Sequence, residues 1–143
     1  MVIYLDTSAF LKLYIREEGS ELVQQVLEAQ DAPVPISDVL EWEFFNALRL
    51  KVFRGELDSA TVDHMMKLFD DRLLRGQYAA ADLDRSLLSR DVRDLSRHSS
   101  TIGSRTLDVV HVAIAAQLKA TRFVTFDDRQ ADLARTAGLP VTP

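Results

Sequence analysis

Residues 1–14 read MVIYLDTSAFLKLY, and residues 122–133 read RFVTFDDRQADL. In both stretches a short apolar run leads to an aspartate, Asp6 or Asp127, and a segment with the apolar spacing of a helix follows. Strands that alternate with helices predict a parallel sheet that is covered on both faces. Because ligands bind beyond the carboxyl ends of the strands in such sheets, we expect Asp6 and Asp127 to point into one crevice.

The rest of the chain continues this alternation. Further strand-like segments are PVPIS at 33–37 and LPVT at 139–142, whereas QYAAADL at 77–83 fits either a short strand or a loop. Helical periodicity fills most of the sequence between them. The pattern predicts an α/β fold with three layers, α/β/α, around a central and mainly parallel sheet, and one domain over residues 1–143.

Glycine and hydroxyl residues mark the expected breaks between elements. Gly55 is expected to end a helix, and Asp58 or Ser59 to cap the next one. Gly138 is expected to end the last helix before the final strand. The stretch Ser96–Thr106, SRHSSTIGSRT, is rich in hydroxyl groups and is therefore expected to be a mobile loop.

Composition narrows the possible chemistry. The 143-residue chain has no cysteine, which excludes disulfides, thiolate metal sites and thiol catalysis. Its net charge of −5 argues against a protein that binds nucleic acid through its charge alone. The longest aliphatic run, residues 112–116, is too short to cross a membrane, and no basic and apolar leader opens the sequence. We therefore expect a cytoplasmic protein with no membrane partner.

Two further acids stand where a carboxylate needs an explanation. Glu43 lies within an apolar stripe of the helix expected after Ser37, where an unpaired carboxylate would be costly. Glu41 is the competing candidate, and its position favours solvent at the edge of the same helix. Asp108 lies in the first turn of the helix expected near Thr106, TLDVVHVAIAAQL.

Each aspartate taken alone is explained by the helix that follows it. Asp6 and Asp127 fit as N-terminal caps, and Asp108 favours the helix dipole. Four converging carboxylates, however, repel one another unless a cation neutralises them. Oxygen ligands select hard ions such as Mg²⁺ or Mn²⁺, and such ions suit reactions at phosphate. The acids together therefore predict a metal site for phosphoryl chemistry.

The histidines add less to this prediction. His111 follows Asp108 by three positions and could act as a ligand or a base. We interpret it instead as a core histidine that is hydrogen-bonded within the helix packing, because imidazole suits Zn²⁺ better than a carboxylate cage. His98 could touch substrate from the expected loop, although a solvated histidine is the simpler interpretation. His64 is expected at the surface.

Four blocks of sequence surround the four acids. They are the apolar run before LDTS, the IS that precedes Glu43 and NAL, the RTLD-x-x-H around Asp108, and the FVTFD that ends at Asp127. They occur in order over nearly the whole chain. As a set they resemble the PIN-domain ribonucleases, and more narrowly the toxins of VapBC-type toxin–antitoxin pairs.

The resemblance implies a site and a function. It implies an acidic quartet that binds Mg²⁺ or Mn²⁺, formed by Asp6, Glu43, Asp108 and Asp127. Thr7 or Ser8 would be the hydroxyl that supports this site. The resemblance also implies hydrolysis of RNA, a cognate antitoxin that restrains it, and usually a homodimer.

Basic residues near the acids could bind RNA locally, although the net charge of the chain is negative. Arg105 stands just before Asp108, and Lys12, Arg16 and Arg129 lie on helices that leave an acidic strand end. With bound divalent ions, these cations would reverse the local field where RNA approaches.

Three other functions fit the same residues less well. A phosphatase of the haloacid-dehalogenase type needs a second acid two positions after the first, where this chain has Ser8. A response-regulator receiver needs a late lysine, and Lys119 is badly placed for that role. A PIN-like module that only binds RNA or protein is a third alternative, and the presence of all four acids weighs against it.

The helix expected from Ser37 to Arg54 carries more apolar surface than one side needs. Trp42, Phe45 and Phe53 lie beyond the stripe that contains Glu43. We expect a second subunit or the antitoxin to cover part of this surface. Burial under the protein's own helices is the alternative.

Overall fold

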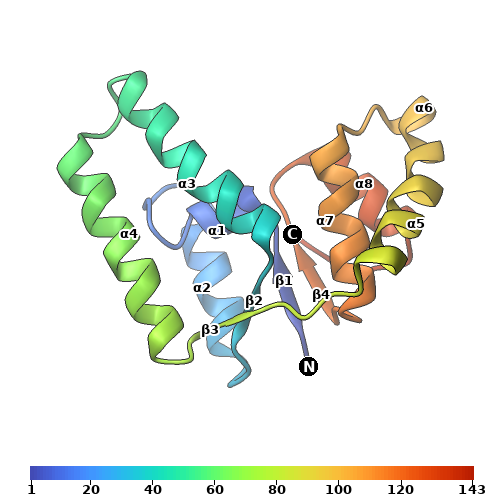
Figure 1. Cartoon of the computed structure of the whole chain (residues 1–143), viewed down its shortest axis with the longest axis horizontal. Coiled ribbons are helices and arrows are strands. Elements are labelled where there is room, and N and C mark those ends of the chain that lie inside the picture. The colour runs from blue at the N-terminus through green and yellow to red at the C-terminus, as the bar shows by residue number, and fades with distance from the viewer.

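In the computed structural model, which describes all 143 residues, parallel strands lie between two groups of helices (Figure 1). The strands are β1 (Ile3–Leu5), β2 (Val34–Ile36), β3 (Tyr78–Ala80), β4 (Arg122–Val124) and β5 (Val141–Thr142). β4 pairs with β1 and β5, β2 pairs with β3, and β1 lies beside β2. Every pairing is parallel, which confirms the predicted fold class.

The helices form the two outer layers. The group on the left of Figure 1 contains α1 (Thr7–Leu11), α2 (Ser20–Glu28), α3 (Asp38–Phe53) and α4 (Ser59–Leu74). The group on the right contains α5 (Arg85–Leu95), the 3-10 turn η1 (Ser96–His98), α6 (Ser99–Ile102), α7 (Thr106–Gln117) and α8 (Asp128–Thr136). None of these helices combines the length and the hydrophobicity that crossing a membrane requires.

The central strand β1 contributes to both apolar cores because its side chains alternate between its faces. Ile3 and Leu5 belong to the core under α1–α4, which also holds Phe44. Tyr4 belongs to the core under α7 and α8, where its ring stacks on Phe123 with centroids 5.6 Å apart. Burying each such side chain stabilises the fold by on the order of 2 kcal/mol. The sheet is thereby fixed between its two layers.

Most of the expected element boundaries are present. The hydroxyl of Ser37 caps α3 by accepting the N–H of Leu40 at 3.1 Å. Asp58, and not Ser59, caps α4. Gly138 follows α8 with a φ of +84°, a conformation that favours glycine, before the chain enters β5. The ambiguous segment at 77–83 contains the strand β3.

The prediction of a loop at Ser96–Thr106 is wrong for most of this stretch. The chain continues from α5 through η1 into α6, and only the residues after Ile102 leave helical geometry before α7. The hydroxyls of Ser96 and Ser100 donate to backbone carbonyls three residues earlier. The groups that suggested a loop therefore form hydrogen bonds inside helical turns, and Gly103, with a φ of +76°, ends them.

Candidate active site

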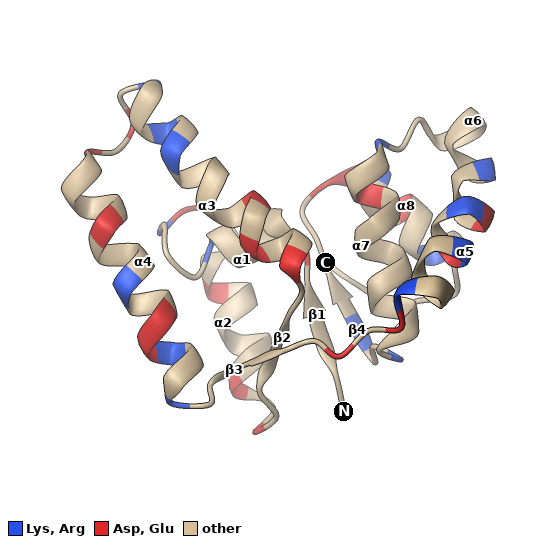
Figure 2. Ribbon diagram, viewed as in Figure 1, with Lys and Arg blue, Asp and Glu red and all other residues tan.

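Asp6 and Asp127 lie at the same edge of the sheet. Asp6 follows β1 and Asp127 lies just beyond β4, and these strands pair with Leu5 opposite Val124. Because both strands run in the same direction, their carboxyl ends bring the two residues to one end of the sheet. Figure 2 shows acidic residues gathered around this end, on the first turns of α3 and α7 and after β4.

The carboxylate of Asp6 is enclosed by hydroxyl groups. Its Oδ1 accepts the Ser8 hydroxyl at 2.6 Å and the Ala9 N–H at 2.9 Å, and its Oδ2 accepts the Thr125 hydroxyl at 2.5 Å. Only 3% of the residue is exposed. Burial raises the pKa of Asp6, although the hydrogen bonds and nearby His111 oppose this effect. None of these donors is a lysine or an arginine, so Asp6 forms no ion pair with either residue type.

The same hydroxyls connect Asp6 to the end of β4. Thr125 accepts the backbone N–H of Asp127 at 3.1 Å, and Ser8 accepts the N–H of Phe126 at 3.0 Å. The side chain of Asp127 accepts the N–H of Gln130 at 3.0 Å and so caps α8. In contrast to Asp6, Asp127 is exposed. Asp6 and Asp127 therefore both form a hydrogen bond with Thr125, but Asp6 is buried and Asp127 is exposed.

Glu43 faces the same region from α3. Its Oε1 accepts the Thr7 hydroxyl at 2.9 Å and contacts Nε2 of His111. Burial raises the pKa of Glu43, but the hydrogen bonds from His111 and Thr7 outweigh this effect, so the pKa lies below its usual range. Thr7 directly follows Asp6 in the chain, so this hydrogen bond holds Glu43 near Asp6.

Glu41 has a different environment. Partial burial raises its pKa, and the negative charges of Asp38 and Asp70 raise it further. Asp70 belongs to α4, on the other side of α3 from α7. The contacts of Glu43 with Thr7 and His111 therefore favour Glu43 as the acid of this edge.

His111 is buried, as the sequence indicated, but its partners were missed. The Tyr4 hydroxyl lies 2.5 Å from its Nδ1, and Glu43 contacts its Nε2. These partners come from β1 and α3, so His111 is hydrogen-bonded where α7 packs against the sheet and against α3. Since both ring nitrogens are engaged, neither is free to bind a metal. The signal in the sequence was the three-residue spacing from Asp108, which places both side chains on one helix face.

Asp108 occupies the first turn of α7. Its Oδ2 accepts the backbone N–H of Arg105 at 3.1 Å, which closes the start of the helix. The Arg105 side chain is exposed and Asp108 is half-buried. Asp6, Asp108 and Asp127 thus each satisfy a backbone N–H at a helix start, as the simpler interpretation of these residues predicted.

The four acids do not form a closed metal cage in this structure. No group of three or more His, Asp or Glu side chains lies close enough together to hold a metal ion. The donor set nevertheless fits a hard cation, because it consists of carboxylate oxygens at one edge of the sheet. Asp6 supports this fit, since a buried carboxylate with no cationic neighbour is costly.

A cavity of about 560 Å³ borders the site. Its wall includes Thr125, Asp127, Asp128 and Arg135. Asp127 is the one acid of the quartet that lines it. This cavity therefore gives a ligand access to the end of β4.

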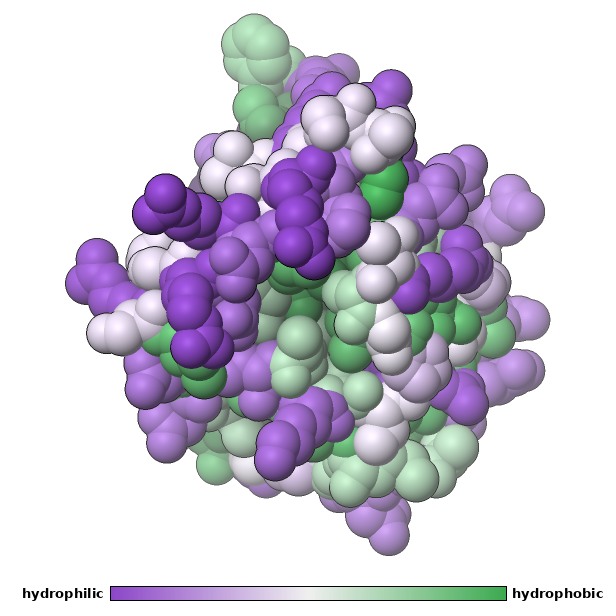
Figure 3. Space-filling view, turned by 90° about the vertical axis from the view of Figure 1, so that its right-hand side faces the viewer, coloured by the Kyte–Doolittle hydropathy of each residue, from purple (hydrophilic) through white to green (hydrophobic).

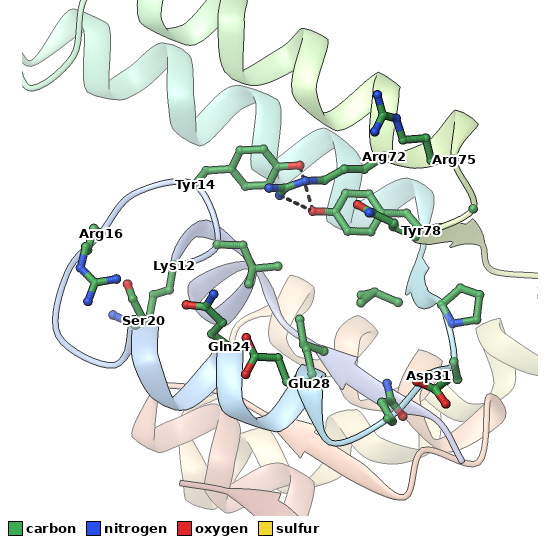
Figure 4. A pocket seen from close by; sticks show the side chains of 18 residues that line it. Lys12, Tyr14, Arg16, Ser20, Gln24, Glu28, Asp31, Arg72, Arg75 and Tyr78 are labelled. Atoms are coloured by element: carbon green, nitrogen blue, oxygen red, sulfur yellow. Dashed lines mark hydrogen bonds between the residues drawn. The ribbon is translucent and has the colours of Figure 1, made fainter.

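A larger cavity, of about 690 Å³, lies away from the acids, between α2, the end of α4 and the starts of β2 and β3 (Figure 4). Tyr78 is central to it: its hydroxyl lies 2.9 Å from that of Tyr14 and accepts Nη1 of Arg72 at 3.0 Å. Lys12 and Arg16 line this cavity and pair with glutamates there. Nζ of Lys12 also lies 4.5 Å from the ring centre of Phe126, the residue before Asp127, so the positive charge expected from Lys12 and Arg16 near the acids stays a prediction.

This chain is similar in sequence to known proteins over nearly its whole length. The family model described as the PIN domain matches residues 3–136. Ribonuclease VapC46 of Mycobacterium tuberculosis is 33% identical over 141 residues, which cover 97% of this chain and 95% of that protein.

Two solved structures share the fold. VapC20 of M. tuberculosis, described as a toxin that cleaves the sarcin–ricin loop, aligns with a TM-score of 0.67 at 15% identity over 96% of this chain and 95% of its own. A chain of VapBC2 from Rickettsia felis, solved bound to a DNA fragment from their promoter, aligns with a TM-score of 0.70 at 14% identity over 99% and 98%.

Proposed function

Because the chain belongs to the PIN-domain family, we propose that it is a metal-dependent endoribonuclease and the toxin of a toxin–antitoxin pair. The relative that is 33% identical is named a ribonuclease. The single observation that carries the proposal for this chain is the buried carboxylate of Asp6, which lacks a cationic partner at the carboxyl end of the central strand. A divalent ion would supply that partner.

Four residues would hold Mg²⁺ or Mn²⁺ in this proposal: Asp6, Glu43, Asp108 and Asp127. When bound, such an ion acidifies water and neutralises negative charge that develops on a phosphate. Ser8 and Thr7 orient the first two carboxylates through their hydroxyls. Arg105, exposed at the start of α7, would bind a phosphate of the RNA backbone.

The experiment is to incubate the purified protein with RNA in Mg²⁺, in Mn²⁺ and in EDTA, and to map the new ends. We expect cleavage only with a divalent ion and products that carry a 5′-phosphate, because water and not the ribose 2′-hydroxyl would attack the phosphate. Cyclic phosphate ends that form equally well in EDTA would contradict the proposal. Binding of RNA without cleavage would favour a non-catalytic module.

We also propose that an antitoxin or a second copy of the chain covers part of α3. Phe45 packs against Phe69 of α4, so the protein's own helices partly bury that side chain. Trp42 and Phe53 remain 66% and 88% exposed. In contrast, the side of α5 and α6 shows mainly hydrophilic residues around a limited apolar area (Figure 3).

The partner proposal is tested by oligomeric state. We expect light scattering to report a homodimer, or a complex with the product of a neighbouring gene, that Phe53→Ser weakens. A monomer that binds no such product would contradict it.

We further propose that the chain acts as one domain in the cytoplasm.

A further inference from the structure

A buried chain of hydrogen bonds ends at Glu43. It starts at Tyr4 on β1, whose hydroxyl lies 2.5 Å from Nδ1 of His111 on α7. Nε2 of His111 then contacts Oε1 of Glu43 on α3. Tyr4 and His111 are 0% and 2% exposed. Three elements that are distant in sequence therefore meet at this carboxylate.

Each hydrogen bond between Tyr4, His111 and Glu43 can be assigned a donor and an acceptor. The hydroxyl of Tyr4 carries a proton and is buried away from water. That proton needs an acceptor, and Nδ1 of His111 provides one. A neutral ring that accepts at Nδ1 carries its hydrogen on Nε2, and it donates this hydrogen to the carboxylate of Glu43.

Both contacts of Glu43 reach the same oxygen. Thr7 donates to Oε1 at 2.9 Å, and His111 contacts Oε1 as well. No hydrogen bond of the protein reaches Oε2. A carboxylate that is fixed by one oxygen in this way can offer the other to a ligand in a constant orientation.

We propose that His111 is a positioning residue: held by Tyr4 in the tautomer with hydrogen on Nε2, it fixes Oε1 of Glu43 and leaves Oε2 for the cation. The role of the cation rests on the proposed function. The arrangement of hydrogens does not, and it is measurable in the metal-free protein.

The first test is nitrogen-15 NMR of the histidine rings in the metal-free parent protein. We expect His111 to show hydrogen on Nε2 and none on Nδ1. Tyr4→Phe removes the donor to Nδ1, so we expect this variant to show a mixture of the two tautomers. Hydrogen on Nδ1 of His111 in the parent protein would overturn the proposal.

The second test compares His111→Gln with His111→Leu. Glutamine retains an N–H near the position of Nε2, whereas leucine fills space without donating. For His111→Leu we expect the Mg²⁺ concentration at half-maximal thermal stabilisation to rise by about tenfold to a hundredfold, and kcat for RNA to fall while KM stays unchanged. We expect His111→Gln to recover most of both losses.

Tyr78→Phe is the matched control. It removes a hydroxyl from another buried tyrosine, in the large cavity away from the acids, and we expect it to leave the Mg²⁺ midpoint unchanged. Equal losses in the Gln and Leu variants would indicate a purely structural role and overturn the proposal. A parent protein that cleaves no RNA, yet shows the expected tautomer and the expected Mg²⁺ shifts, would end the ribonuclease proposal and leave the positioning role supported.

Discussion

Two pairs of acids reach the same edge of the sheet in different ways. Asp6 and Glu43 accept side-chain hydrogen bonds from other residues, including Thr125 and His111, which are distant in sequence. Asp108 and Asp127 accept backbone N–H groups at the starts of their own helices. The first pair depends on tertiary packing for its orientation, whereas each member of the second pair is oriented by local structure.

The two environments have different consequences for stability. Burial makes the charge of Asp6 unfavourable, whereas Asp127 stabilises the start of a helix. Burial raises the pKa of Asp6, so its ionised carboxylate costs stability in the metal-free fold, a pattern that is typical of functional sites. The exposed carboxylate of Asp127 has an ordinary role as a cap. A substitution that keeps the shape but removes the charge should therefore change stability at Asp6 and leave it nearly unchanged at Asp127.

The largest expected effect is that of Asp6→Asn on cleavage. We expect activity to fall by about a hundredfold or more, because the variant loses a charged ligand. The metal-free variant should be as stable as the parent protein or more stable, by about 1 kcal/mol. Mg²⁺ should raise the melting temperature of the parent protein more than that of the variant.

Thermal melts and cleavage rates check this prediction. Asp58→Asn is the control, because Asp58 is an exposed cap of α4 away from the site. We expect it to leave cleavage and the Mg²⁺ shift unchanged. A destabilised metal-free Asp6→Asn variant with an unchanged Mg²⁺ shift would show that Asp6 is only a cap.

The next effect separates Glu43 from Glu41. Glu43→Gln should lower the cleavage rate by about tenfold to a hundredfold, because Glu43 faces Thr7 and His111 at the site. Glu41→Gln should change it by less than about twofold, a change typical of a residue outside the site. Cleavage assays at saturating Mg²⁺ measure both, and the reverse order would assign the second acid to Glu41.

A smaller effect is the pH dependence of stability in the metal-free protein. The folded pKa of Asp6 is raised, so its ionised form destabilises the fold and Asp6→Asn should gain stability as pH rises through that pKa. The folded pKa of Glu43 is lowered, so its contribution is present above the unfolded pKa and is lost as pH falls through the folded one.

The two substitutions should therefore diverge with pH. Relative to the parent protein, Asp6→Asn should be favoured near neutral pH, Glu43→Gln should be disfavoured there, and both differences should shrink in acid. Urea melts between about pH 4 and pH 7, the range that spans the ionisation of ordinary carboxyl groups, measure this. Parallel curves for the two variants would contradict the difference in their environments.

The smallest effect concerns Asp127. Asparagine is also a good cap, so Asp127→Asn should leave the metal-free protein at the stability of the parent, without the gain expected at Asp6. Asp127→Ala removes the acceptor for the N–H of Gln130 and should cost about 1 kcal/mol. Denaturant melts of the two variants measure the difference, and a clear gain for Asp127→Asn would place this residue with Asp6.

The local part of the fold followed from the sequence. The strand that ends before Asp6, a helix cap at Asp58 or Ser59 and the first-turn position of Asp108 depend on residues that are neighbours in the chain. The one clear error, at Ser96–Thr106, arose because hydroxyl groups can bond either to loop backbone or to carbonyls within a helical turn. Composition does not distinguish these two uses.

The sequence by itself determined the parallel α/β fold and the four acids as candidates, because apolar periodicity and residue type are local properties. Only the tertiary structure placed the Tyr4 hydroxyl and Glu43 on the two nitrogens of His111, and Lys12 beside a different cavity. These contacts join residues as many as 107 positions apart. Which buried polar groups meet depends on how the helices pack on the sheet, and a pattern along the chain does not encode those distances.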